Sequence, residues 1–147
     1  MNALGPAGFL LIALAGAFGA LLRYLLDVLL SAAQHRRATP GTRIFPLGIL
    51  LANSLACLLV GAGAAWAARH GIAWHPGDLD SWPGLLVLAL VLGVGGGLST
   101  MSTFIVAAVS LWRSGARAMA VSYTGLTIGA GLAAGLLGGL LASLLPW

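Results

Sequence analysis

The sequence GGGLSTMSTF at residues 95–104 places three glycines and four hydroxyl side chains in the middle of a long apolar segment. This segment runs from Pro83 to Trp112, about thirty residues without a charge. One straight helix of that length would extend ~45 Å, whereas the hydrocarbon core of a bilayer is only ~30 Å thick. Glycine is a poor helix former, and hydroxyls compete for backbone hydrogen bonds. The pattern predicts a membrane helix that breaks near the bilayer midplane, within residues 96–101.

Composition alone leaves two interpretations of this break open. Non-helical backbone at membrane depth is tolerated only where it is buried in protein or lines a cavity, and transport proteins bind ions at such breaks. Alternatively, the segment is a tilted helix whose small residues let neighbouring helices pack closely.

The overall composition indicates an integral membrane protein. Of the 147 residues, 60% are hydrophobic and only 7% are charged, and the mean hydropathy is +1.03. This is too little charge to cover the surface of a soluble domain. The net charge of +4 comes from a few arginines near the ends of apolar segments, without the basic cluster typical of nucleic-acid binding. We therefore expect membrane lipid, and no nucleic acid, among its partners.

Four apolar segments divide the chain, and each is long enough to cross a bilayer. The N-terminus lacks the basic region of a signal peptide, so the first segment is interpreted as a retained span. The linkers are too short for a catalytic or regulatory domain. We expect an all-α membrane protein with a single transmembrane domain over residues 1–147, in which four transmembrane helices cover about 7–30, 45–68, 83–112 and 118–145.

The linker arginines are distributed unequally between the two sides of the membrane. Four spans place both termini on one side, so the first and third linkers share the other. Those two linkers carry five of the arginines, and Arg69 alone lies on the side of the termini. The positive-inside rule therefore predicts cytoplasmic first and third linkers and external termini. The five are Arg36, Arg37, Arg43, Arg113 and Arg117.

Polar residues within the first two spans need partners. Asn53, near the centre of the second span, either donates to a passing anion or forms an interhelical hydrogen bond worth ~0.6–2 kcal/mol. Arg23 lies on the first span with Asp27 one turn later. It can pair with Asp27, extend to the interface or attract anions at a vestibule.

Polar and aromatic residues of the last two spans suggest a track through the protein. Tyr123 and Thr127 fall one turn apart on one helix face, and with Ser102 and Thr103 they can line a narrow wet path. Tyr123 can instead belong to the interfacial aromatic belt. Phe104 follows the break, and an aromatic edge attracts anions, although an isolated ring more often serves packing.

The sequence disfavours two other classes of function. No span carries a carboxylate near its middle, which argues against a small multidrug exporter driven by protons. No cluster of metal ligands and no nucleophile–base pair is visible, so an enzyme is not expected.

Four motifs, one on each span, are informative together. They are GAFGALLRY at 16–24, FPLG at 45–48 followed by Asn53, GGLSTMSTF at 96–104, and Tyr123 with Thr127. Each is weak alone, but in this order and on these spans the chain resembles the Fluc/CrcB family of fluoride channels. The resemblance covers all four spans.

This resemblance implies a bacterial inner-membrane channel that exports fluoride passively as an antiparallel dimer with two pores. It also implies a structural sodium ion at the centre, held by backbone carbonyls at Gly96 and Ser99. The implied anion pathway comprises Asn53, Thr103, Phe104, Tyr123 and Thr127, with Arg23, Met101 and Ser102 as further candidates in the pathway or its vestibule.

Three features depart from the family pattern. Ile49, Ala56 and Cys57 replace residues of the second span that are usually small or hydroxylated, which predicts different packing of that helix. Met101 replaces the first phenylalanine of an aromatic pair, and a thioether has no positive ring edge for an anion. The arginine bias also favours one orientation in the membrane, whereas an antiparallel homodimer needs both. The partner is therefore either a second copy or an oppositely oriented homologue. In the second case this chain is a non-conducting or half-competent subunit of a heterodimer.

Overall fold

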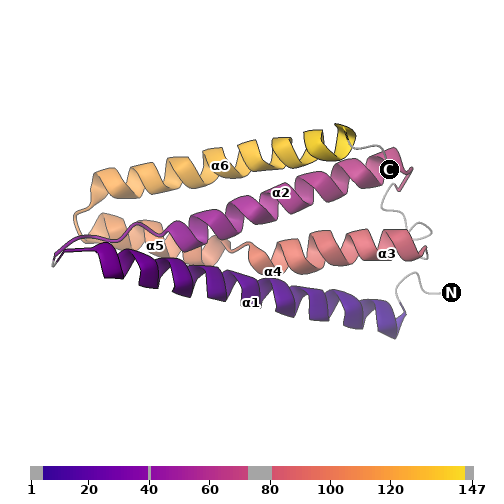
Figure 1. Cartoon of the computed structure of the whole chain (residues 1–147), viewed down its shortest axis with the longest axis horizontal. Helices are drawn as coiled ribbons and strands as arrows, with labels where there is room; N and C mark the ends of the chain where they lie inside the picture. Colours follow the sequence, from indigo (N-terminus) through magenta and orange to yellow (C-terminus); the bar gives the residue numbers. More distant parts are fainter. Residues whose placement is uncertain (1–4, 40, 73–80, 145–147) are drawn as a thin grey trace.

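The computed structural model describes residues 5–39, 41–72 and 81–144. All regular structure in these residues is helical, and four helical spans are long and apolar enough to cross a membrane, which confirms the predicted fold class (Figure 1). The helices are α1 (Pro6–Arg37), α2 (Leu47–Arg69), α3 (Trp82–Leu88), the π-helix η2 (Ala89–Gly95), α4 (Gly96–Leu98), α5 (Met101–Arg113) and α6 (Arg117–Leu144).

Helix α1 is longer than the sequence suggested. The predicted span ended at about residue 30, but the helix continues to Arg37. Alanine, glutamine and arginine are good helix formers. The basic residues of the last turn also interact favourably with the helix dipole. The added turns project beyond the apolar part of the span.

The third span breaks at the hydroxyl residues and not at the glycines. Gly95 and Gly96 both have helical backbone angles, whereas Ser99 (φ −74°, ψ 150°) and Thr100 (φ −152°, ψ 112°) are extended. The Thr100 hydroxyl accepts a hydrogen bond from the Thr103 N–H at 3.3 Å and so caps α5. The seven-residue η2 precedes the break, and nothing in the sequence pattern predicted this wider turn.

The glycines around the break hold α1 close to the third span. A Cβ added at Gly97 would overlap the Gly16 carbonyl oxygen, and one added at Gly19 would overlap the Val94 carbonyl oxygen. The second interpretation, an unbroken tilted helix, is therefore wrong, although the glycines do pack helices as it supposed; the hydroxyls form the break.

Helices α2 and α6 form the most extensive contact between helices. A Cβ at Gly61 would overlap the Gly135 carbonyl, and a Cβ at Gly138 would overlap the Leu58 carbonyl. Backbone approach this close needs glycine at the crossing points, as in other small-residue interfaces of membrane helices.

Helix directions separate the two ends of the bundle (Figure 1). The end of α1, the start of α2 and the α5–α6 turn share one end, and the start of α1 and the end of α6 share the other. At each end one arginine binds the last carbonyls of a neighbouring helix: Arg43 donates to Ser114 O (2.6 Å), and Arg69 donates to Ala142 O and Ser143 O (2.9 Å each). The end that holds the α5–α6 turn still carries five arginines and the other end carries Arg69, as the sequence predicts.

Candidate functional site

Asn53 on α2 holds the broken backbone of the third span. Its Oδ1 accepts from the Thr100 N–H at 2.8 Å, and its Nδ2 donates to the Thr100 carbonyl at 3.4 Å. The structure therefore shows the interhelical hydrogen bond that the sequence left as one of two alternatives. The amide carries a second N–H, which these two bonds do not use.

The break releases the two carbonyls that the resemblance assigned to sodium. In a continuous helix, Gly96 O would accept from the Thr100 N–H, which goes to Asn53 instead. Likewise Ser99 O would accept from the Thr103 N–H, which goes to the Thr100 hydroxyl. Among the described residues, Gly96 O receives only a long 3.4 Å bond from the Ser99 hydroxyl. Both carbonyls thus keep lone pairs that helix bonding would have used.

Arg23 reaches the break from α1. Its Nη1 donates to Thr103 Oγ1 at 3.5 Å, and Thr103 Oγ1 also accepts from Thr100 Oγ1 at 2.9 Å. Of the three alternatives for Arg23, pairing with Asp27 is wrong, because the guanidinium is directed across to α5. Its Nε is buried and has no partner within the part of the chain that the structure describes. A cationic donor is therefore placed beside the hydroxyls of the break.

Asp27 instead lies against the start of α2. A Cβ added at Gly48 would overlap the Asp27 backbone and lie 2.7 Å from its Oδ1. A carboxylate at a helix N-terminus complements the helix dipole. The acid is thus near one end of the bundle, as expected for a chain without a proton-carrying carboxylate at mid-membrane.

An aromatic cluster surrounds Tyr123. Its side chain is 0% exposed, with ring centroids 5.6 Å from Phe45 in an edge-on arrangement and 5.5 Å from Phe104. The alternative that Tyr123 belongs to the interfacial belt is wrong, because a belt residue faces lipid and water. The cluster brings the predicted residues Phe104 and Tyr123 together from two helices.

Two hydroxyls beside this cluster are buried without partners. Tyr123 Oη and Thr127 Oγ1 lie close enough to interact with each other, but neither makes a hydrogen bond of ordinary geometry within the described residues, and Thr127 is only 7% exposed. Both lie on one face of α6, one turn apart. Buried polar groups are nearly always hydrogen-bonded, so these two donors point to a ligand or water that satisfies them.

Other predicted residues face away from this interior path. Met101 is 70% exposed, and Ser102 is also exposed, so neither joins Phe104 and Tyr123 within one chain.

Sequence reasoning missed Thr100, which links Asn53 to Thr103, and Phe45, which packs on Tyr123. The T-x-x-T spacing at residues 100–103 was the available signal for Thr100, since it is typical of an N-cap.

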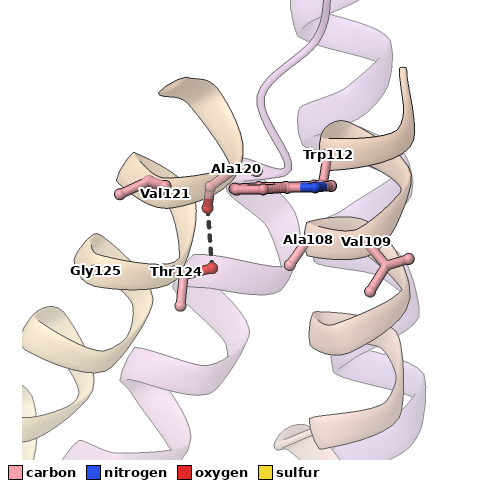
Figure 2. Close-up of a pocket in the computed structure, with 7 residues that line it drawn as sticks. All are labelled: Ala108, Val109, Trp112, Ala120, Val121, Thr124 and Gly125. Carbon is pink, nitrogen blue, oxygen red and sulfur yellow. Dashed lines mark hydrogen bonds between the residues drawn. The ribbon is translucent and has the colours of Figure 1, made fainter. Parts of the chain in front are cut away.

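A groove of about 480 Å³ between α5 and α6 does not belong to the polar site (Figure 2). Its only hydroxyl, on Thr124, donates to the Ala120 carbonyl of its own helix at 2.9 Å. The Trp112 ring and small side chains provide the rest of the surface, which suits an apolar occupant and not an ion.

Replacing Asn53 with leucine should lower the free energy of unfolding by about 1–3 kcal/mol, because the Thr100 N–H and carbonyl would lose their partners inside the membrane. The measurement is equilibrium unfolding in mixed micelles. Ser54→Ala is the matched control, since the Ser54 hydroxyl donates only to Leu50 O of its own helix. Equal stability of the two variants would show that Asn53 does not hold the break.

Comparison with known proteins agrees with this architecture. The family described as "CrcB-like protein, Camphor Resistance (CrcB)" matches residues 10–139. The chain is 35% identical to the fluoride-specific ion channel FluC of Renibacterium salmoninarum, over 82% of this chain and 87% of that protein. It is 34% identical to FluC of Bordetella bronchiseptica (90% and 89% covered) and 36% identical to FluC of Paracoccus denitrificans (84% and 95% covered). With its four spanning helices, this multi-pass plasma-membrane protein belongs to the CrcB family, whose members are ion channels and not enzymes.

Proposed function

We propose that this chain forms a fluoride channel that lowers cytoplasmic fluoride by passive export. Fluoride enters cells from acidic surroundings as HF and is trapped inside as the anion. A selective pathway then lets the anion leave down its electrochemical gradient. The relatives named as fluoride-specific channels support this assignment over most of the chain.

The pair of unpartnered hydroxyls on Tyr123 and Thr127 carries the proposal. Fluoride is small and strongly hydrated, so a selective path must replace its water with dense hydrogen-bond donors. The two hydroxyls provide such donors inside the protein, next to the ring of Phe104. Thr103, with the Arg23 guanidinium on its hydroxyl, lies at the broken end of α5, and the remaining N–H of Asn53 approaches that end from α2.

A structural sodium ion fits the break. Hard cations prefer oxygen ligands, and unwound carbonyls at a membrane midplane are a common source of them. Gly96 and Ser99 offer carbonyls whose helical donors are directed elsewhere. Sodium bound there would balance the partial negative charge of these carbonyls and fix the two halves of the span.

A second chain is needed to cover this region. Gly96, Ser99, Met101 and Ser102 are exposed in the single chain, and Gly96 and Ser99 border an open hollow of about 380 Å³. Polar backbone at membrane depth cannot face lipid. We therefore propose an antiparallel dimer in which two breaks face each other and share the cation.

The deciding experiment is fluoride efflux from liposomes that contain this protein alone, with chloride as the control anion. Fast fluoride efflux without chloride efflux is expected. Folded protein that releases no fluoride would contradict the proposal of a self-sufficient channel.

The second candidate is a half-competent subunit that conducts only with an oppositely oriented homologue. It is favoured by the five arginines on one side of the membrane and by Met101, whose side chain is exposed on the surface of the single chain. Accessibility labelling of the two termini separates the candidates: labelling from both sides supports a homodimer, and labelling from one side supports a heterodimer.

A further inference from the structure

A pocket of about 280 Å³, with a mostly apolar surface and two arginines in its wall, lies at the arginine-rich end of the bundle and shares Phe45 with the aromatic cluster around Tyr123. It is formed where α1 ends and the chain enters α2, and its wall contains Gln34, Arg37, Thr42, Arg43 and Phe45. No carboxylate lines it. The two arginines suit an oxyanion, because arginine matches phosphate oxygens with paired N–H donors. The Thr42 hydroxyl is already bonded to the Thr39 hydroxyl at 2.8 Å.

One of the two arginines is already held in place. Arg43 Nη2 donates to the Ser114 carbonyl at 2.6 Å, which fixes its guanidinium between the first linker and the α5–α6 turn. A guanidinium has five N–H donors, so four remain after this bond. Preorganisation of this kind reduces the entropy lost when a ligand binds.

The depth of the pocket places it at the level of lipid phosphates. The apolar part of α1 ends near residue 30, and the helix continues to Arg37. Seven residues at 1.5 Å each extend ~10 Å beyond the hydrocarbon core, into the headgroup region. Arginine pockets at this level on the cytoplasmic side are suited to anionic headgroups.

The amide of Gln34 indicates what else the ligand carries. Gln34 Oε1 is buried and has no hydrogen-bond donor among the described residues. Arginine-bound phosphate diesters accept hydrogen bonds but donate none, whereas a headgroup hydroxyl donates one. The last torsion of a glutamine side chain is soft, so the amide can turn its oxygen toward the pocket.

From these contacts we propose that the pocket binds an anionic phospholipid with a hydroxylated headgroup. Arg37 and Arg43 bind its phosphate, and Gln34 accepts from its headgroup hydroxyl. Free hydrogen phosphate also combines a phosphate with a hydroxyl. The test must therefore distinguish the lipid from the free ion. The inference is independent of fluoride conduction, because its readout is lipid binding.

The test uses the full chain in a neutral detergent. Short-chain phosphatidylglycerol, short-chain phosphatidylcholine and inorganic phosphate are titrated separately, and bound ligand is counted by native mass spectrometry. Phosphatidylglycerol should bind at least ~10-fold more tightly than the other two ligands. Arg37→Gln should weaken that binding ~10-fold, which corresponds to about 1.4 kcal/mol for a charged hydrogen bond.

Arg36→Gln is the matched control. It removes the same charge from the same helix end, but Arg36 does not line the pocket. Binding in this variant should change less than about twofold. Equal loss of phosphatidylglycerol binding in both arginine variants would overturn the site. The effect would then be a general electrostatic attraction to the arginine-rich end of the bundle. Equal affinity for inorganic phosphate and phosphatidylglycerol would overturn the lipid as its occupant.

Gln34→Leu tests the hydroxyl contact. The comparison lipid is phosphatidylmethanol, an anionic diester without a headgroup hydroxyl. The variant should bind phosphatidylglycerol and phosphatidylmethanol with about equal affinity. An unchanged preference would remove Gln34 from the site.

Discussion

Phe104→Ile is expected to slow fluoride efflux from proteoliposomes about 5–30-fold. The Phe104 ring packs 5.5 Å from Tyr123, beside the buried Tyr123 and Thr127 hydroxyls. A ring edge is positive and attracts a partly dehydrated anion, whereas an isoleucine side chain offers no such field. The contact between an anion and a ring edge is taken to be of the same order as a desolvated contact between a cation and a ring face, about 1–2 kcal/mol. Each 1.36 kcal/mol added to a barrier slows passage tenfold.

The control for this variant is Phe18→Ile. Phe18 is 54% exposed on α1, so the same change there removes a ring without touching the cluster around Tyr123. Its efflux rate should match that of the unmodified protein. If Phe104→Ile also conducts at the unmodified rate while remaining folded, Phe104 is not part of the anion pathway.

Gly138→Ala is expected to destabilise the protein by about 1–3 kcal/mol or to prevent folding. The new Cβ would overlap the Leu58 carbonyl and lie 3.0 Å from the Ala62 nitrogen, and both obstacles are backbone atoms. Helices α2 and α6 would have to separate along their most extensive contact, and overpacking of this kind typically costs 1–3 kcal/mol. The measurement is the unfolding midpoint in mixed micelles.

Gly129→Ala on the same helix is the matched control. A Cβ there meets nothing within 4 Å, and alanine is a better helix former than glycine. Its unfolding midpoint should stay the same or rise slightly. A similar loss of stability in both variants would show that α6 is sensitive to any added methyl group, and that the crossing with α2 is not its critical contact.

The spans and the approximate position of the break were predictable because they depend on local chemistry. Apolar runs of more than twenty residues must cross the membrane whatever their neighbours are. The hydroxyls at residues 99–103 compete for backbone donors in any helix. The true end of α1 was missed, because helix formation past Leu30 depends on gradual propensities and not on a sharp hydropathy change.

The partners of the polar residues could not be predicted, because they lie on other helices. Arg23 had Asp27 within reach along its own helix, yet it binds Thr103, eighty positions away. Tyr123 suited the interfacial belt by its residue type, but Phe45, just before α2, and Phe104 on α5 enclose it. A single sequence gives spacing along a helix and not which faces meet.

The sequence by itself determined a four-span membrane protein, an arginine-rich end and a third span that breaks among hydroxyls. Only the tertiary structure decided which backbone groups the break releases. Asn53 comes from α2 and takes the Thr100 N–H, so the Gly96 carbonyl loses its helical donor. The physical reason is that hydrogen bonds at membrane depth must be made with whatever protein lies nearby, and helix packing alone fixes what that is.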